Sequence, residues 1–343
     1  MKGAGRVYFI RVSESDAVEA VKAKLVRLID GSSILDFIDK NNDVAVKMHF
    51  GEEGNTGHVD PEYAGVVCRK IIEKGALPFL ADTNTLYRGR RTNSADHIKL
   101  AHEHGFTREV CSAEVVVPDD VTGEKIASIF LKADSLVSLA HFKGHMMTGF
   151  GGGLKNIGMG CASREGKLAQ HAEIAPIVKV ESCRGCFECI KSCPADAIYK
   201  EGKHVVIDPA KCIGCATCIA VCVHGTIEIP WESGGMNIQE KMIEYAGAVL
   251  SKKKGKTGFI NFAVKITKEC DCLAKDDPRI APDIGIFASI DPVSADKACY
   301  DACIKACGKD IFKAAHPDRD GLKQLKHAAK IGLGNLDYEL TEL

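Results

Sequence analysis

The sequence lacks the features of several large functional classes. It has no uninterrupted apolar run near the ~20 residues that cross a membrane, so we expect no membrane span. The stretch MKGAGRVYFIRVSES has one short apolar segment, broken by Arg11, and no cleavage-site pattern, which argues against a signal peptide. The formal net charge is -1 with scattered positive residues, which argues against nucleic acid as the main partner. Nucleophile triads, phosphate loops and nicotinamide fingerprints are also missing.

Cysteine, in contrast, is abundant, with 16 residues in a chain of 343. Without an export signal, so many cysteines imply a reducing cytosol and thiolates that serve as ligands rather than disulfides. We therefore expect a cytoplasmic protein, and a homodimer is the usual oligomeric state in that compartment.

Eight of the cysteines form two copies of one spacing, in which two residues separate the first three and three residues separate the last two. The copies are Cys183, Cys186, Cys189, Cys193 and Cys212, Cys215, Cys218, Cys222. This spacing is typical of two [4Fe–4S] clusters, where each run gives three thiolates to one cubane and its fourth to the other. A zinc site or a disulfide frame is the alternative, which the spacing disfavours.

The segment resembles the bacterial two-cluster ferredoxins, except that Val223 stands where the second run would have a proline. The spacing pairs Cys183, Cys186 and Cys189 with Cys222, and Cys212, Cys215 and Cys218 with Cys193. Two exposed cubanes would suit an anaerobic metabolism.

Strands and helices alternate on both sides of this module, which predicts an α/β fold with a mostly parallel sheet covered on both faces. A capping box at Ser13 and Asp16 predicts the first helix start. We expect residues 1–179 to form the first part of the α/β domain, 180–230 an inserted α+β ferredoxin-like 2[4Fe–4S] module, and 231–343 the second part of the α/β domain. Two independent domains flanking the module are the alternative.

Polar residues collect where the predicted strands end, and parallel sheets bind ligands at that edge. Lys47 and His49 end the second strand, Asp82 ends the third, and His145 lies just beyond the fifth. His49 and Asp82 are therefore candidate catalytic residues.

The stretch HFKGHMMTGFGGGLKNIGMG contains the consecutive glycines Gly151, Gly152 and Gly153. Such glycines permit close approach of the backbone to a ligand, and their N–H groups can form an anion nest. With Lys155 and Asn156 they are the predicted cofactor-binding residues. A plain tight turn is the alternative.

Two family resemblances extend these predictions. The motifs GEEGNTGHVDP, ADTNTLYRGRRT, HFKGHMMTGFGGGLKN, CDC and PDIGIFASIDPV resemble an uncharacterised family of iron–sulfur-centre proteins, which implies the fold and the cofactor but no reaction. Residues 145–171 are distantly similar to the nickel-pincer lactate racemases. That resemblance implies a catalytic base at His145, a cofactor-bearing lysine at Lys155 and a metal-binding imidazole at His171, although Gly151 and Met159 replace the usual serine and proline.

Cys270 and Cys272 form a second thiol pair, which could hold an additional metal centre if His49, His145 or His171 completed it. Two ordinary reduced cysteines are the alternative. Cys299, Cys303 and Cys307 share one helix face and are expected in the core.

Together these features predict an iron–sulfur oxidoreductase that binds metal and transfers electrons. Two [4Fe–4S] clusters would relay electrons between a ferredoxin-like redox partner and a cleft that takes a small-molecule substrate, with His145 moving protons. The alternative is a non-catalytic electron carrier or an assembly protein for another redox enzyme. A third hypothesis is a redox-neutral, metal-dependent racemase with a modified Lys155.

Overall fold

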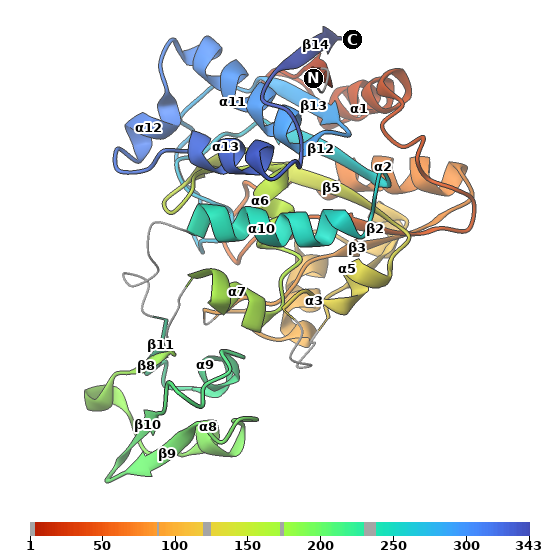
Figure 1. Ribbon diagram of the computed structural model, residues 1–343. Coiled ribbons are helices and arrows are strands. Elements are labelled where there is room, and N and C mark those ends of the chain that lie inside the picture. Colours follow the sequence, from red (N-terminus) through yellow and green to blue (C-terminus); the bar gives the residue numbers. More distant parts are fainter. Residues whose placement is uncertain (1–3, 88, 119–124, 172–174, 230–237) are drawn as a thin grey trace.

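The computed structural model describes residues 4–87, 89–118, 125–171, 175–229 and 238–343. Its centre is an eight-stranded sheet in the order β14-β1-β13-β12-β5-β2-β3-β4 (Figure 1). The strands are β1 (Gly5–Arg11), β2 (Asp43–Lys47), β3 (Leu77–Ala81), β4 (Glu114–Val116), β5 (Ser135–His141), β12 (Thr257–Ala263), β13 (Gly285–Ser289) and β14 (Tyr338–Glu342).

Most neighbours in this sheet are parallel. β12, β5, β2, β3 and β4 run in one direction, β14 is parallel to β1, and β13 is antiparallel to both of its neighbours. The predicted α/β fold with a mostly parallel sheet is confirmed.

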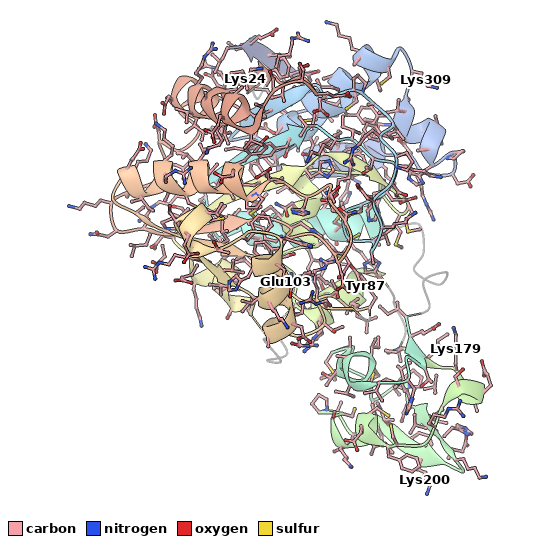
Figure 2. All side chains as sticks on the ribbon, turned by 180° about the vertical axis from the view of Figure 1, so that it is seen from behind. Lys24, Tyr87, Glu103, Lys179, Lys200 and Lys309 are labelled. Atoms are coloured by element: carbon pink, nitrogen blue, oxygen red, sulfur yellow. The ribbon has the colours of Figure 1, made fainter. Side chains whose placement is uncertain are left out.

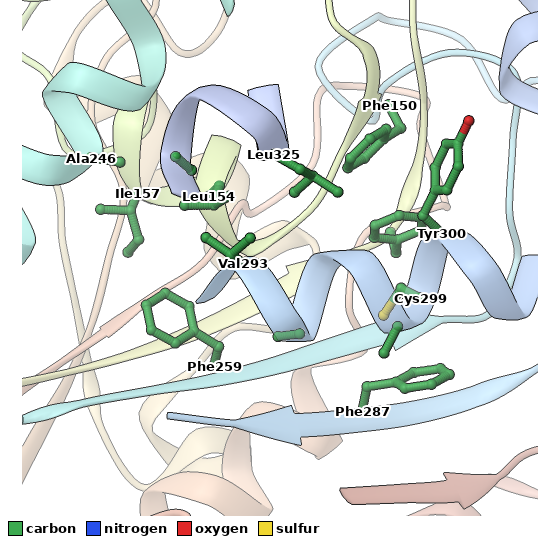
Figure 3. Packing of buried hydrophobic residues seen from close by; sticks show 14 of the residues in the cluster. Phe150, Leu154, Ile157, Ala246, Phe259, Phe287, Val293, Cys299, Tyr300 and Leu325 are labelled. Carbon is green, nitrogen blue, oxygen red and sulfur yellow. The ribbon is translucent and has the colours of Figure 1, made fainter. Parts of the chain in front are cut away.

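Helices cover both faces because the strands bury side chains on each side. On one face α1 (Val18–Ser32) and α2 (Pro61–Glu73) pack in a hydrophobic cluster with Val44 and Val46. On the other face the cluster includes residues of α6 (Gly153–Gly158), α10 (Ile238–Ser251), α11 (Pro292–Cys307) and α13 (Leu322–Lys330). Figure 3 shows Cys299 in this second cluster beside Phe287, and Cys303 belongs to it too, as expected.

Local sequence signals explain several helix ends. Asp60 accepts a hydrogen bond from the N–H of Glu62 at the start of α2, and Asp291 caps α11 through Val293 and Ser294. The helix start predicted at Ser13 and Asp16 is wrong, because α1 begins at Val18. Asp16 instead accepts the backbone N–H of Ser13 and pairs with Lys24, so the two residues form a turn before the helix.

The cysteine-rich module lies between two strands that are neighbours in the sheet. β5 precedes it, β12 follows it, and the two pair in parallel from Leu136–Thr257 to His141–Phe262. The predicted module boundary at residue 230 falls in 230–237, outside the described residues.

The module contains short elements of its own, seen at the bottom of Figure 1. β8 pairs with β11, and β9 pairs with β10, both antiparallel. Its elements are β8 (Ile177–Val178), the 3-10 helix η1 (Val180–Ser182), α8 (Glu188–Lys191), β9 (Ile198–Glu201), β10 (His204–Ile207), α9 (Thr217–Val221) and β11 (Ile227–Glu228).

The remaining elements lie in the main domain, where the β6–β7 hairpin was not predicted. They are α3 (Ser94–Glu103), α4 (Arg108–Cys111), α5 (Ser128–Lys132), β6 (Lys143–His145), β7 (Gly149–Gly151), α7 (Arg164–His171) and α12 (Ile311–Ala315). Within the described residues, no helix combines the length and the apolar character needed to cross a membrane.

Candidate functional site

The two cysteine runs have the same backbone conformation, repeated 29 residues apart. Gly185 and Gly214, each two residues after the first cysteine of its run, have φ of 64° and 73°. Phe187 and Ala216 follow at 60° and 58°, immediately before α8 and α9. A residue other than glycine rarely adopts a left-handed backbone conformation. The recurrence of this conformation at equivalent positions therefore shows that both runs fold into the same cysteine loop.

Cysteines from both runs line one cavity. Three of them, Cys212, Cys215 and Cys218, come from the second run, and Cys193 comes from the first. Burial and then the neighbouring thiols of Cys222 and Cys186 raise the pKa of Cys189. The fourth cysteine of the first run therefore lies with the first three of the second.

Backbone N–H groups point at the fourth cysteine of each run. Ala197 donates to Sγ of Cys193 at 3.3 Å, and Thr226 donates to Sγ of Cys222 at 3.4 Å. Both donors lie four residues after the cysteine that they contact. Hydrogen bonds to cluster sulfurs are one of the means by which a protein sets a cluster potential.

The module packs against two segments of the main domain. Leu86, which follows β3, and Leu168 of α7 join the buried cluster that contains Cys189 and Cys218. A Cβ atom placed on Gly214 would lie 3.5 Å from Cδ2 of Leu168. Figure 2 shows the neighbouring Tyr87 on the side of the main domain that faces the module. The loop that carries Cys212 and Cys215 therefore rests on α7.

Cys270 and Cys272 lie in the loop between β12 and β13, at the carboxyl edge of the parallel strands. The N–H of Leu273 donates to the carbonyl of Cys270 at 3.1 Å, which closes a tight turn over the pair. The hydroxyl of Tyr87 donates to the carbonyl of Cys272 at 2.8 Å, and Arg91 donates to the same oxygen at 3.3 Å. The turn is thus tied to the segment after β3.

Asp271, between the two cysteines, is buried and holds two basic groups. Its Oδ1 lies 2.7 Å from Nδ1 of His141 on β5, and its Oδ2 lies 3.2 Å from Nζ of Lys143 on β6. Burial opposes ionisation of Asp271, but His141 and Lys143 outweigh it and hold its pKa well below the usual value. Asp271 therefore fixes the cysteine turn to the end of the central strand.

The structure brings His145, Cys270 and Cys272 together, with one ligand atom from each within 4.8 Å of the others. Within the described ranges it is the one group of three such side chains this close together. Nζ of Lys155 lies 3.7 Å from Sγ of Cys270. A hydrogen bond from Cys272 and, against the effect of burial, the ammonium of Lys155 lower the pKa of Cys270, whereas its interaction with Cys270 and burial raise the pKa of Cys272.

His145 lies beside this sulfur pair, and both His145 and His171 are neutral rings. Burial, followed by Lys155 and Lys143, holds the pKa of His145 well below its usual value. Nδ1 of His145 accepts the backbone N–H groups of Met147 and Thr148 at 3.2 and 3.3 Å, so the neutral ring carries its proton on Nε2. Burial and then Lys155 lower the pKa of His171 to about 3.

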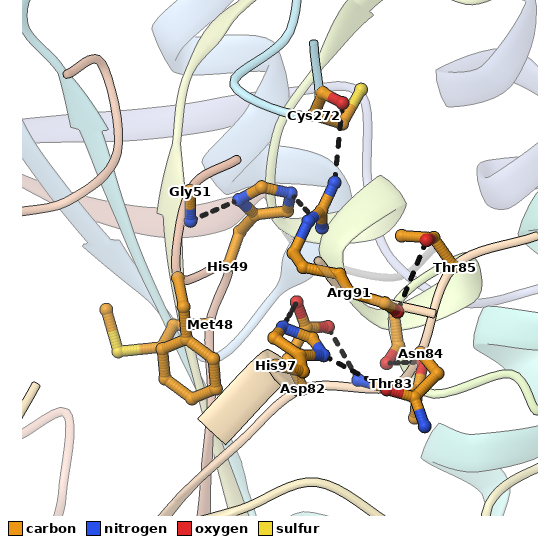
Figure 4. A network of polar contacts seen from close by, with 12 residues as sticks. Met48, His49, Gly51, Asp82, Thr83, Asn84, Thr85, Arg91, His97 and Cys272 are labelled. Atoms are coloured by element: carbon orange, nitrogen blue, oxygen red, sulfur yellow. Dashed lines mark hydrogen bonds and ion pairs between the residues drawn. The ribbon is translucent and has the colours of Figure 1, made fainter. Parts of the chain in front are cut away.

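His49 belongs to the same polar network, in which Arg91 lies between it and the cysteine turn (Figure 4). Its Nε2 lies 2.7 Å from Arg91, and its Nδ1 accepts the N–H of Gly51 at 2.9 Å. Arg91 also donates from Nε to Glu52 at 2.9 Å. Arg91, which donates to the carbonyl of Cys272, therefore links His49 to the cysteine turn by hydrogen bonds. Arg91 lies within the family motif ADTNTLYRGRRT. Because it lies ten residues beyond the end of β3, its strand-end position did not predict its contact with the cysteine turn.

Asp82 lies in a second buried charge cluster, which also contains Lys47 and Lys167. Its Oδ1 lies 3.0 Å from Nζ of Lys47 and accepts the N–H of Thr83 at 2.8 Å. Burial opposes ionisation of Asp82, but Lys47 and its neighbours lower its pKa. Lys167 donates to the carbonyls of Asn84 and Ala162, and burial lowers its pKa to about 7 although Asp82 opposes this.

The glycine loop approaches a protein side chain closely. Gly153 and Leu154, at the start of α6, donate their N–H groups to the buried carboxylate of Asp296 at 2.7 and 3.0 Å. A Cβ on Gly152 would lie 2.5 Å from that carboxylate, and one on Gly151 would lie 3.0 Å from Cδ of Lys155. Asn156 accepts from Lys47 and donates to its carbonyl, which links α6 to β2. Gly153, one of the three glycines predicted to hold a ligand, thus donates its N–H to Asp296 instead.

We predict that Asp271→Asn destabilises the protein, because the amide leaves the buried ammonium of Lys143 without a counter-charge. Breaking a buried pair in this way costs about 3–5 kcal/mol. Urea unfolding followed by circular dichroism would measure the loss, with the exposed Asp318→Asn as the control. An Asp271→Asn protein as stable as the parent would contradict the anchoring role.

Lys167 should make stability depend on pH. Its pKa is about 7 in the fold against an ordinary value of 10.5, so the unfolded chain binds more protons between these pH values. The free energy of unfolding should therefore rise with pH across this window, on the order of 1 kcal/mol per pH unit. Urea titrations at pH 7.5 and 9.5 should show a smaller rise for Lys167→Met than for the parent or for the exposed control Lys99→Met.

Comparisons with known proteins support an iron–sulfur segment. A 50-residue segment is 46% identical to indolepyruvate oxidoreductase subunit IorA of Methanothermobacter thermautotrophicus, covering 14% of this chain and 8% of that one. A 49-residue segment is 41% identical to a ferredoxin of Alicyclobacillus acidocaldarius, covering 14% and 63%. Both matches span less than two-thirds of those relatives. Part of the chain therefore resembles iron–sulfur electron-transfer proteins, one of them a subunit of an oxidoreductase.

A lactate racemase apoprotein from Thermoanaerobacterium thermosaccharolyticum aligns in structure at 15% identity, over 76% of this chain and 51% of that one, with a TM-score of 0.38. The family model that matches is described as a domain of unknown function, DUF362, and it covers residues 44–301. Because that model spans most of the chain, the protein belongs to the DUF362 family.

Proposed function

We propose that the protein is an iron–sulfur oxidoreductase in which two [4Fe–4S] clusters relay electrons between a ferredoxin-like partner and the buried site at Cys270 and Cys272. The observation that carries the proposal is that cysteines from both runs line one cavity of the module. Cys193 from one run shares a cavity with Cys212, Cys215 and Cys218 from the other. Cys183, Cys186, Cys189 and Cys222 would hold the second cluster.

The contact between the module and the main domain supports a direction for the relay. The loop around Gly214 rests on Leu168 of α7, while Cys186 of the first run is exposed. The cluster held with Cys186 would exchange electrons with the partner, and the cluster held with Cys215 would face the main domain. The clusters supply the one-electron chemistry, and the residues around them set its potential.

The buried site has the groups that an electron acceptor needs. Lys155, Lys143 and His145 surround the sulfur pair, so negative charge that accumulates there is stabilised in a medium of low polarity. The additional metal centre that the sequence predicts at Cys270 and Cys272 would also occupy this position. A small-molecule substrate would meet the same cationic groups.

The cluster content is the first prediction of this function. Anaerobically purified protein should contain about eight irons per chain, and Cys215→Ser should lose about four of them because one cubane loses a ligand. Iron analysis with electron paramagnetic resonance would measure both. Cys307→Ser, a half-buried cysteine on α11, is the control and should keep all the iron. A metal content above eight atoms per chain, whether iron, nickel or zinc, would establish the additional centre if the excess disappears when Cys270 and Cys272 are mutated.

A second prediction separates the enzyme from a non-catalytic carrier. Replacing His145, Lys155 and His171 together should leave the cluster signals intact and abolish turnover with the physiological partner, because only the acceptor site changes. Electron transfer from reduced ferredoxin, measured anaerobically, provides the readout. Unchanged transfer with every redox partner would favour the carrier.

A further inference from the structure

The sulfur pair is incomplete as a closed structural metal site. Such a site takes four protein ligands, whereas one group of three side chains is present among the described residues. A histidine that ligates a metal donates its other ring N–H to an acceptor, but Nδ1 of His145 accepts N–H groups from Met147 and Thr148. The ammonium of Lys155, 3.7 Å from Cys270, would repel a cation.

The same geometry suits two sulfurs that react with each other. The turn closed by Leu273 brings Cys270 and Cys272 together, with their sulfur atoms within 4.8 Å of each other. A disulfide needs Cα atoms about 4.4–6.8 Å apart, which a tight turn permits for residues i and i+2. A disulfide that closes so short a loop is strained and easily reduced.

The surrounding residues hold this turn through its backbone and through Asp271. These contacts leave the two sulfurs free to form or break a bond with each other. Tyr87 and Arg91 bind the carbonyl of Cys272, and Glu52 donates its N–H to the carbonyl of Asp271 at 3.1 Å. Cys270 is 3% exposed, while Cys272 is half-buried. Cys270 is therefore shielded beside Lys155, and Cys272 is the more exposed residue of the pair.

We propose that Cys270 and Cys272 form a redox-active dithiol, which alternates with a disulfide and collects two electrons from the two clusters. This inference rests on the proposed function, because the clusters supply the electrons. It names the acceptor at the end of the relay and gives the reason for two one-electron centres, since a disulfide needs two electrons.

The step balances as follows. The Cys270–Cys272 sulfur–sulfur bond breaks, each reduced cluster gives one electron, and one proton from solvent is taken up. The products are a thiolate on Cys270, paired with the Lys155 ammonium, and a thiol on Cys272. The ultimate reductant is a low-potential one-electron donor of the ferredoxin class. In the reverse direction the dithiol would reduce the clusters.

The test follows the tryptic fragment Glu269–Lys275, which contains these two cysteines and no other. The full chain, with its clusters verified by iron analysis, is oxidised with oxidised glutathione and then reduced with methyl viologen radical, a one-electron donor. Alkylation and mass spectrometry of the fragment should show a crosslink after oxidation and two alkyl groups after reduction.

The variant Cys215→Ser separates this inference from the proposed function. In it the crosslink should persist with methyl viologen and open with dithiothreitol, whereas Cys307→Ser should behave like the parent. Clusters that load normally, without any crosslink at Cys270 and Cys272, would overturn the dithiol alone. A crosslink that opens equally fast in Cys215→Ser, or a stoichiometric metal bound by the pair, would also overturn it. Protein without iron would overturn the proposed function, and the dithiol relay with it.

Lys155 provides a second readout. Because its ammonium stabilises the Cys270 thiolate, Lys155→Met should lower the equilibrium constant for reduction about tenfold, which moves the two-electron midpoint about 30 mV negative. Lys155→Arg should retain the parent midpoint. Equal midpoints in all three proteins would show that Lys155 does not act on the pair.

Discussion

The buried carboxylate of Asp271 is the interaction on which the candidate site depends. It joins a loop from the second half of the chain to His141 and Lys143 from the first half. The backbone carbonyl of Asp271 accepts the N–H of Glu52, and the carbonyl of Cys272 accepts from Tyr87 and Arg91. Three strand ends therefore converge on one turn. Removing a carboxylate from such a place leaves buried cations unpaired, which is why the turn and the sheet edge stabilise each other.

Sequence periodicity predicted the sheet and most of its helices because those elements depend on local apolar repeats and caps. Asp60 and Asp291 mark helix starts in the structure as their side-chain chemistry indicates. Ser13 and Asp16 failed as a helix start because Asp16 pairs with Lys24 instead, and such a contact between side chains is not encoded in a short motif. The order of the strands likewise depends on packing across the whole chain.

The candidate site was predicted in part. Strand-end position identified His145, the glycine stretch and the racemase resemblance identified Lys155, and cysteine spacing identified the sulfur pair. The structure brings these residues together. His49 and Asp82 also follow strands, yet they contact Arg91 and Lys47 rather than the sulfurs. Distances of a few ångströms between side chains depend on rotamers and long-range packing, which residue spacing alone does not determine. Asp296 illustrates this limit, because a helix distant in sequence occupies the N–H groups of the glycine loop.

The position of the module between β5 and β12 has a consequence for assembly of the chain. These two strands are neighbours in the centre of the sheet, and everything from Phe142 to Lys256 must be looped out before they can pair. The entropy lost on closing a loop grows with its flexible length, by about 0.6 kcal/mol for each doubling. Cluster loading would convert part of that loop into a compact unit and so shorten its flexible length. Iron supply would then influence how fast the central strands find each other, as well as whether electrons can flow.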